Sequence, residues 1–326
     1  MKRKGNLELD KKDREILYLL DLNGRLSYSQ IARKVKISKQ VAKYRIERLE
    51  KEGFIKGYFT MIDTSRLGYT TFRVYLKFRN LTPDVKKEII DYLKSKKQNW
   101  AVVLITGKWD IALGVTVTDI YDFYTVWEKI LNKYLEHIGE YTTCIYSPIF
   151  HYSKSYLIGE EDNSKVRILG GNEKASFDQK DIEILTFISN NARVSLLEVS
   201  KKLDLTPEAI SSRLKILEKK GIIQGYRAMI DVNKFGYEFY KAEIRLSDYG
   251  KIKSILNFCH LHPNIYQVDK TIGGETLEIE FHVKSVREML KIIEDFEIAF
   301  PNVIERFDYI TILSEEKTTY MPHLVI

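Results

Sequence analysis

An internal duplication constrains the fold of this chain more than any other feature of the sequence. Residues 9–69 align with residues 177–237 without a gap, at a constant spacing of 168 positions, and 23 of the 61 aligned positions are identical. Two long copies argue against a solenoid, which has shorter periods and more repeats. The segment between them, residues 159–176, is polar and contains a Gly pair, which predicts a flexible linker. As a coil it would span about 20–25 Å, enough for the two copies to pack together as a pseudo-dimer.

Each copy begins with three short helix signals. In the first copy, Asp10 can cap the first helix, Ser27 and Gln30 form a capping box at the second, and Ser38 can cap the third. The second copy repeats these signals with Asp178, the capping box Ser195 and Glu198, and Thr206 followed by Pro207. Only a few residues separate the second and third helices, which predicts a tight helix-turn-helix. Gly53 and its counterpart then end the third helix before a short strand, as in a winged module.

The remainder of each copy is rich in β-branched and aromatic residues, in the order β-α-β-β-α-β. This order predicts a ferredoxin-like sheet and an α+β fold class. The first copy has expected strands at 70–78, 99–107, 109–117 and 140–150, and expected helices at 83–96 and 119–135. The second has expected strands near 239–246, 264–272, 276–284 and 303–314, and expected helices near 249–261 and 285–299. We expect domains at 1–64, 65–158, 177–232 and 233–326, with the linker at 159–176.

The charge of the chain is concentrated at its N-terminal end. The net charge is +7, yet the first 70 residues alone carry +8 and residues 241–326 carry −4. A basic module favours a polyanionic partner, because Lys and Arg displace counterions from phosphates, although a solvated Lys-rich surface is the alternative. Cys144 and Cys259 belong to no paired motif, which argues against disulfides and zinc. Without a long apolar run, we expect a cytoplasmic protein with no membrane partner.

The third helix differs between the copies on one face only. Its apolar stripe, Ala42, Ile46 and Leu49, is preserved in the second copy, whereas Lys39, Gln40, Lys43 and Tyr44 become Pro207, Glu208, Ser211 and Ser212. In a helix-turn-helix, the N-terminal turn of this helix meets base edges and phosphates, for which Lys, Gln and Tyr are suitable donors. We therefore predict a DNA-contacting set of Ser38, Lys39, Gln40, Lys43, Tyr44 and Arg45. Arg45 recurs as Arg213, so bracing of the helix is an alternative role.

The stretch LDKKDREILYLLDLNGRLSYSQIARKVKISKQVAKYRIERLEKEGFIKGY closely resembles the Lrp/AsnC (feast/famine) family of transcriptional regulators. The β-α-β-β-α-β unit that follows resembles the family's RAM domain, which binds effectors and forms oligomers. The family's Gly-x-x-Asp turn, near its amino-acid site, corresponds here to Gly107 and Asp110. The second copy keeps Gly273 but has Thr276 at the Asp position, so an effector site is expected only in the first copy. Alternatively, Gly107 serves only to form the turn.

The resemblance implies a sequence-specific regulator that binds double-stranded DNA and responds to an amino acid or related metabolite. Since dimer symmetry ordinarily makes both reading helices identical, we expect at least a homodimer of tandem chains, in which two first-copy modules read the DNA. We expect no enzymatic activity, catalytic residue, cofactor or metal. Two alternatives stay open, a siroheme-decarboxylase-like enzyme of the same architecture and a protein-binding adaptor. We expect His260 and His262 to be ordinary surface or core residues, and the aromatics of one helix, Tyr121, Phe123, Tyr124 and Trp127, to be core.

Overall fold

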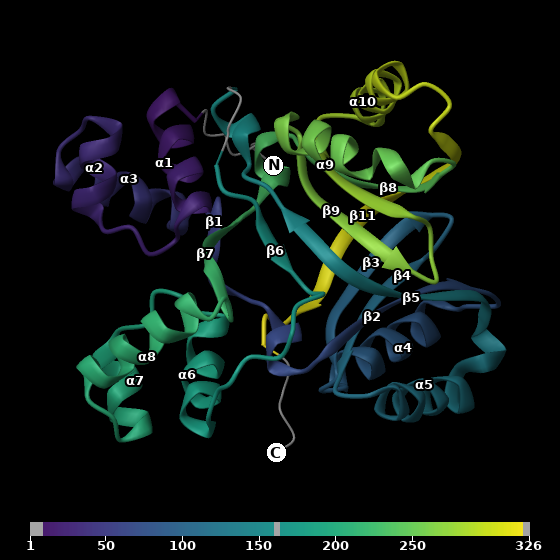
Figure 1. Ribbon diagram of the computed structural model, residues 1–326, viewed down its shortest axis with the longest axis horizontal. Helices are drawn as coiled ribbons and strands as arrows, with labels where there is room; N and C mark the ends of the chain where they lie inside the picture. Colours follow the sequence, from purple (N-terminus) through teal and green to yellow (C-terminus); the bar gives the residue numbers. More distant parts are fainter. Residues whose placement is uncertain (1–8, 160–163, 322–326) are drawn as a thin grey trace.

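The computed structural model describes residues 9–159 and 164–321. The first residues of the basic N-terminal segment, positions 160–163 of the expected linker and the last five residues of the expected fourth domain lie outside this range. Two layers make up the described part of the chain: the helix-turn-helix units lie on one side, and a large sheet with its covering helices lies on the other (Figure 1). No helix among residues 9–159 and 164–321 is both long and apolar enough to cross a bilayer.

The first layer contains two three-helix units with the capping residues that the sequence predicts. The helices are α1 (Lys11–Leu22), α2 (Tyr28–Val35) and α3 (Lys39–Lys51) in the first copy, and α6 (Gln179–Ser189), α7 (Leu196–Leu203) and α8 (Pro207–Lys219) in the second. Asp10 and Ser27 both form reciprocal capping boxes. At Ser195 only half of the expected box forms, because the hydroxyl accepts from the Glu198 backbone N–H without a reciprocal bond.

The two helix-turn-helix units are joined to each other within the chain. Strand β1 (Ile55–Ile62) follows α3, strand β7 (Ile223–Ile230) follows α8, and the two strands pair antiparallel. Arg25 Nε donates to the Ala192 carbonyl at 2.6 Å, and its counterpart Arg193 Nε donates to the Gly24 carbonyl at 2.6 Å. Apolar residues of both units belong to one continuous core. The relative placement of α3 and α8 is therefore set inside a single chain.

The second layer is one sheet built by both copies. Its strands are β2 (Thr70–Phe78), β3 (Asn99–Gly107), β4 (Ile111–Val117), β5 (Ile138–His151), β6 (Arg167–Leu169), β8 (Glu238–Leu246), β9 (Ile265–Ile272), β10 (Leu277–Val283) and β11 (Ile304–Thr318). Their order is β2-β4-β3-β11-β8-β10-β9-β5-β6, and β2 also pairs with β5. All strands except β6 therefore form a closed ring, which leaves them no free edge. Since β3 pairs with β11 and β5 pairs with β9, the two sheet units form the expected pseudo-dimer.

Four helices cover the outside of this barrel. Helices α4 (Pro83–Ser95) and α5 (Ile120–Tyr134) cover the first copy, and α9 (Ile252–Leu261) and α10 (Val286–Ala299) cover the second (Figure 1). Short 3-10 helices complete the chain at η1 (Thr64–Leu67), η2 (Leu135–His137), η3 (Ser155–Leu157), η4 (Val232–Phe235) and η5 (Tyr249–Lys251). Along β2, Phe72, Val74 and Leu76 pack in the core under α4 and α5. The alternate residues, Arg73 and Tyr75, consequently face the inside of the barrel.

The expectation that all four aromatics of α5 belong to the core is wrong for two of them. Phe123 is buried and stacks on Phe72, with ring centroids 4.1 Å apart, and Trp127 is half-buried. Tyr121 and Tyr124 are 73% and 55% exposed. The core-facing stripe of α5 consists of Phe123, Val126 and Ile130, so the two tyrosines lie on the opposite, solvent-facing side of the helix.

The segment between the copies is more ordered than a coil. It contains β6, which pairs with β5, with Leu169 opposite Ile149. Beyond β6, Asn172 Nδ2 donates to Asp63 Oδ2 at 2.7 Å, and the Ala175 N–H donates to the Arg66 carbonyl at 2.8 Å. These contacts fasten the connection to the end of β1 and to η1, at the junction between the two layers.

Candidate functional site

Helix α3 presents a polar, cationic face to solvent. The Ser38 hydroxyl caps the helix by accepting from the Val41 N–H at 3.2 Å. Ala42, Ile46 and Leu49 are fully buried, which fixes the orientation of the helix on the core. The opposite face consists of exposed side chains, namely Lys39, Gln40, Lys43 and Tyr44. The structure therefore brings together four of the predicted DNA-contacting residues on one free surface, with Ser38 at its N-terminal end.

Within residues 9–159 and 164–321, none of these four side chains makes a strong internal interaction. Lys43 Nζ lies 3.7 Å from Glu47 Oε1, and both side chains are more than half exposed. Such a surface pair contributes roughly 0–1 kcal/mol and gives way readily to a phosphate. Tyr44 is 65% exposed, so its ring and hydroxyl are accessible to a partner.

Arg45 has a different environment from its neighbours on the helix. Its Nη1 donates to Asp10 Oδ2 at 2.7 Å and to Asp13 Oδ1 at 2.9 Å, which braces α3 against the start of α1. Arg213 makes the equivalent pairs with Asp178 and Asp181 in the second copy, and it holds the pKa of Asp178 below its usual value. The geometry shows the bracing role, and DNA contact by Arg45 stays a prediction.

Helix α8 packs on the core through the same buried positions as α3, but its exposed face is different. Ile210, Leu214 and Leu217 are buried as in α3, and Thr206 caps the helix in the same way. Its outward face begins with Pro207 and the exposed Glu208, followed by Ser211 and Ser212. This surface lacks cations at the positions where α3 has them, and a carboxylate would repel phosphates.

The predicted effector pair Gly107 and Asp110 forms a turn, and its carboxylate is engaged there. Asp110 Oδ2 accepts from the Phe78 N–H at 2.8 Å, and Oδ1 accepts from Lys77 Nζ at 3.0 Å. Gly107 has φ of +118°, a conformation that favours glycine. In the second copy, the Thr276 hydroxyl accepts from the Leu246 N–H at 3.1 Å. The turn thus caps the end of β2 in the first copy and the end of β8 in the second, and amino-acid binding at this turn stays a prediction.

His260 and His262, in the second copy, have ordinary structural roles. His260 Nε2 lies 3.1 Å from the Ser164 carbonyl, and its ring stacks on Tyr152. His262 Nδ1 accepts from the Asn264 N–H at 3.2 Å. Within residues 9–159 and 164–321, no three His, Cys, Asp or Glu residues form a group that could hold a metal ion.

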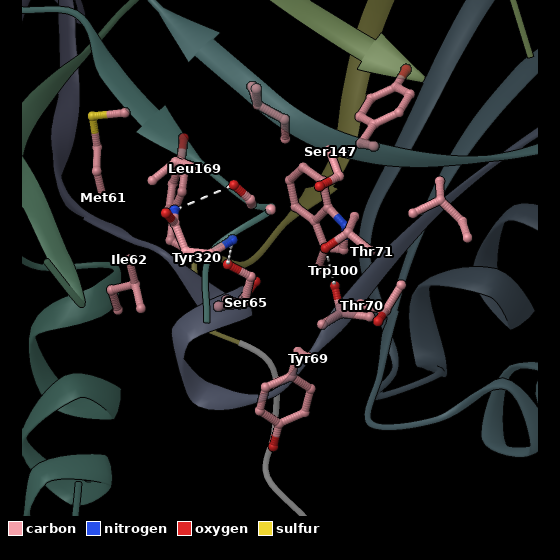
Figure 2. Close-up of a pocket in the computed structure, with 18 of the residues that line it drawn as sticks. Met61, Ile62, Ser65, Tyr69, Thr70, Thr71, Trp100, Ser147, Leu169 and Tyr320 are labelled. Carbon is pink, nitrogen blue, oxygen red and sulfur yellow. Dashed lines mark hydrogen bonds between the residues drawn. The ribbon is translucent and has the colours of Figure 1, made fainter. Parts of the chain in front are cut away.

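A cavity that the sequence did not predict lies where the helix-turn-helix pair, the connecting segment and the barrel meet. Its volume is about 640 Å³. Figure 2 shows Met61 and Ile62 of β1 on one side of it, and Trp100 and Ser147 on the other. Its basic and imidazole side chains are Arg73, Lys174 and His151. Burial and the nearby Arg227 hold the pKa of His151 well below its usual value, so the imidazole is neutral.

One signal for this cavity was present in the sequence. Arg73 stands between Phe72 and Val74 in the strand TTFRVYLKF, where period-2 alternation directs it to the opposite face from these two residues. A buried cation on the inner face of a barrel needs a counter-charge or a ligand. The segments that complete the cavity are distant in sequence, so its shape depends on tertiary structure.

The paired winged helix-turn-helix units, with one exposed cationic third helix, define a DNA-binding protein of the winged-helix class. A family model described as winged helix-turn-helix DNA-binding matches residues 9–56 and 177–224. An uncharacterised HTH-type transcriptional regulator of Pyrococcus furiosus is 39% identical over 123 residues, which cover 36% of this chain and 79% of that protein. The HTH-type transcriptional regulator LrpC of Bacillus subtilis is 28% identical over 122 residues, 36% of this chain and 80% of LrpC.

The chain belongs to the Lrp/AsnC family of HTH-type transcriptional regulators, and it carries the helix-turn-helix unit twice. It is accordingly a DNA-binding transcriptional regulator. The crystal structure of the siroheme decarboxylase NirDL has the same fold, with a TM-score of 0.64, 12% identity, and coverage of 96% of this chain and 94% of that one. The tandem architecture is therefore shared between a regulator family and an enzyme.

Proposed function

We propose that this regulator reads DNA mainly through α3 and that α8 is a structural counterpart with little DNA affinity. The observation that carries the proposal is the contrast between the exposed faces of α3 and α8, two helices whose buried positions match. Lys39 and Lys43 are exposed on α3, whereas α8 has Pro207 and Ser211 at the same positions. Lysines at such positions donate to guanine edges or neutralise phosphates, and each base-edge contact contributes roughly 1–3 kcal/mol.

Matched alanine variants of the two helices test this asymmetry. A DNA site is first selected from a random pool with the wild-type protein. Replacing Lys39 and Lys43 by Ala should weaken binding to that site at least about 25-fold, if both lysines contact base edges. Replacing Glu208 and Ser211 by Ala should change affinity by less than about twofold. Equal losses from the two double variants would refute the asymmetry, and circular dichroism establishes that both are folded.

The asymmetry has a consequence for assembly on DNA. Pairing of β1 with β7 joins α3, with Lys39 and Lys43, to α8, which lacks cations at those two positions, within each chain. A symmetric operator needs two equivalent reading helices, one for each half-site. We therefore expect two chains, each contributing α3, to occupy one operator, and we expect the protein to form at least a homodimer there. We also expect this regulator to respond to an effector, namely an amino acid or a related metabolite.

A second candidate function is tetrapyrrole chemistry like that of the siroheme decarboxylases. The observation in its favour is the cavity, which brings Arg73, Lys174 and His151 together. The sequence suggested the opposite, since the strands expected to line such a site contain no His. NirDL has also been crystallised in complex with an iron-uroporphyrin III analogue. Titration with iron-uroporphyrin III, followed by absorption spectroscopy and by mass spectrometry for loss of CO₂, tests this candidate. An unchanged spectrum and mass would exclude it.

A further inference from the structure

Arg73 is a buried cation without a direct counter-charge. Arg73 is 7% exposed and lines the cavity. Among residues 9–159 and 164–321 it makes no hydrogen bond or ion pair, and its Nε is buried without an acceptor. Its guanidinium lies 5.6 Å from the ring centroid of Trp100 and 4.9 Å from that of Tyr146. Trp100 also lines the cavity, and its buried Nε1 finds no acceptor in the part of the chain that the structure describes. Two hydrogen-bond donors are thus unsatisfied at the same wall.

The second copy shows what ordinarily surrounds a cation at this position. Arg73 lies opposite Gly114 in the β2–β4 pair, and its counterpart Lys241 lies opposite Glu280 in the β8–β10 pair. Lys241 is as buried as Arg73 but makes three ion pairs. Its Nζ lies 3.1 Å from Asp269, 2.8 Å from Glu278 and 2.7 Å from Glu280. The buried cation of the second copy is therefore fully compensated.

The first copy has none of these three carboxylates. At the matching register positions, Asp269, Glu278 and Glu280 are replaced by Val103, Ala112 and Gly114. No side chain fits at Gly114, because an added Cβ would lie 2.5 Å from Trp100 Nε1. The indole of Trp100 therefore packs where the second copy has a carboxylate, and Arg73 has no counter-charge from this strand pair.

The surroundings keep the guanidinium charged at a distance without pairing with it. Burial alone would lower the pKa of Arg73, but Tyr146, Tyr75 and Glu278 raise it above its usual value. Glu278 is occupied by Lys241, by Tyr75 Oη at 2.7 Å and by Tyr146 Oη. The acceptor that Arg73 lacks has to enter from the cavity side.

The rest of the cavity is suited to a large apolar body. Apolar side chains from four segments line it, namely Phe59, Met61, Ile145, Ile149, Leu169 and Tyr320. A volume of about 640 Å³ lies in the middle of the range for small-molecule sites and well above the size of a free amino acid. A buried cation at one wall and a mainly apolar lining elsewhere favour an amphiphilic anion.

We propose that this cavity binds an organic carboxylate with a bulky apolar body, whose carboxylate pairs with Arg73 and accepts from Trp100 Nε1. A guanidinium presents the planar donor geometry that matches a carboxylate. The ligand would contact β1, the connecting segment and the barrel at once, because Met61, Leu169 and Ile145 all line the cavity. Binding would therefore fix the helix-turn-helix pair relative to the barrel. Fixing this placement would in turn control DNA affinity. This regulatory step rests on the proposed function, whereas ligand binding does not.

Pyrenebutyrate and its neutral analogue pyrenebutanol are suitable matched probes, followed by pyrene fluorescence and by quenching of Trp fluorescence. The wild-type protein should bind pyrenebutyrate at least tenfold more tightly than pyrenebutanol. Arg73→Gln should abolish this preference, and Arg73→Lys should retain part of it. Lys129→Gln, at an exposed cation on α5 outside the cavity lining, should leave it within about twofold. Thermal melting establishes that the variants are folded.

Equal affinity of the wild-type protein for both probes would overturn the proposal, even if the Arg73 variants failed to fold. A loss of preference in Lys129→Gln equal to that in Arg73→Gln would overturn the assignment to Arg73. Displacement of pyrenebutyrate by uroporphyrin III would support the site and identify a tetrapyrrole as the source of the carboxylate. Displacement by decanoate alone would support an acyl carboxylate. If the probe binds but DNA affinity is unchanged, the ligand site stands and the regulatory step fails.

Discussion

Removal of Asp21 from the junction of the two layers should destabilise the protein strongly. Asp21, on α1, is fully buried. Arg227 of β7 donates to it from Nε at 3.0 Å and from Nη2 at 2.6 Å, and Lys154 donates from Nζ at 3.0 Å. Burial alone would raise the pKa of Asp21, but Arg227 and Lys154 outweigh it and hold the pKa far below its usual value. The carboxylate therefore neutralises two cations that are themselves almost completely buried.

The expected loss follows from the charges left behind. Asp21→Ala would leave Arg227, which is 2% exposed, without its carboxylate. Breaking a buried ion pair by removing one partner typically costs about 3–5 kcal/mol. The duplicated chain also offers a compensated variant, since the counterparts of Asp21 and Arg227 are Ser189 and Phe59. The double variant Asp21→Ser with Arg227→Phe removes the more deeply buried cation together with the carboxylate and leaves only Lys154 unpaired, so it should lose clearly less stability than Asp21→Ala.

Urea denaturation followed by circular dichroism measures these differences, with Glu15→Ala as the control. Glu15 pairs with Lys12 at 3.1 Å on a partly exposed surface, where a salt bridge contributes about 0–1 kcal/mol. The reasoning would be refuted if Asp21→Ala lost less than about 1 kcal/mol, or no more than Glu15→Ala. It would also be refuted if the double variant were less stable than the single one.

Two further predictions concern the sheet layer. Burial and Glu278 raise the pKa of Glu243 to about 7, so its contribution to stability is present below its unfolded pKa and is lost, by about 3 kcal/mol, as the pH rises through 7. Glu243→Gln should therefore flatten the decline in melting temperature between pH 5 and 8, and an unchanged decline would contradict this. Asp110→Ala and Thr276→Val should each cost about 1–3 kcal/mol in urea denaturation, because each leaves a strand-end N–H without its acceptor; a loss at only one of the two positions would show that the turns are not equivalent.

Much of the architecture was accessible from local sequence signals. The caps at Asp10, Ser27 and Ser38 form as predicted, and the expected strands and helices of both copies are present to within a few residues. The pseudo-dimer of sheet units also forms, because the duplicated strands pair with each other in β3–β11 and β5–β9. These features depend on short-range patterns and on the repeat itself.

Features that depend on distant partners were not accessible in the same way. Strand β6 has only three residues, and its pairing is set by the position of β5. Tyr121 and Tyr124 are aromatic, which suggested that they are buried. Packing decides which side of α5 faces the barrel, and it leaves both exposed. The cavity needs β1, β5, the connecting segment and the end of β11 together. The sequence also could not show that Arg73 lacks the counter-charge that Lys241 has. This depends on the strand register, which places Gly114 where the second copy has Glu280.

The central claim is that each chain contributes one DNA-reading helix, α3, so that an operator takes two chains. Multi-angle light scattering of the wild-type protein on its selected DNA site tests it most directly. The account predicts that the complex contains two chains of 38.3 kDa per site, and that replacing Lys39 and Lys43 by Ala prevents its formation. A complex with one chain per site, formed at full affinity, would contradict the account and would make α8 a second reading helix.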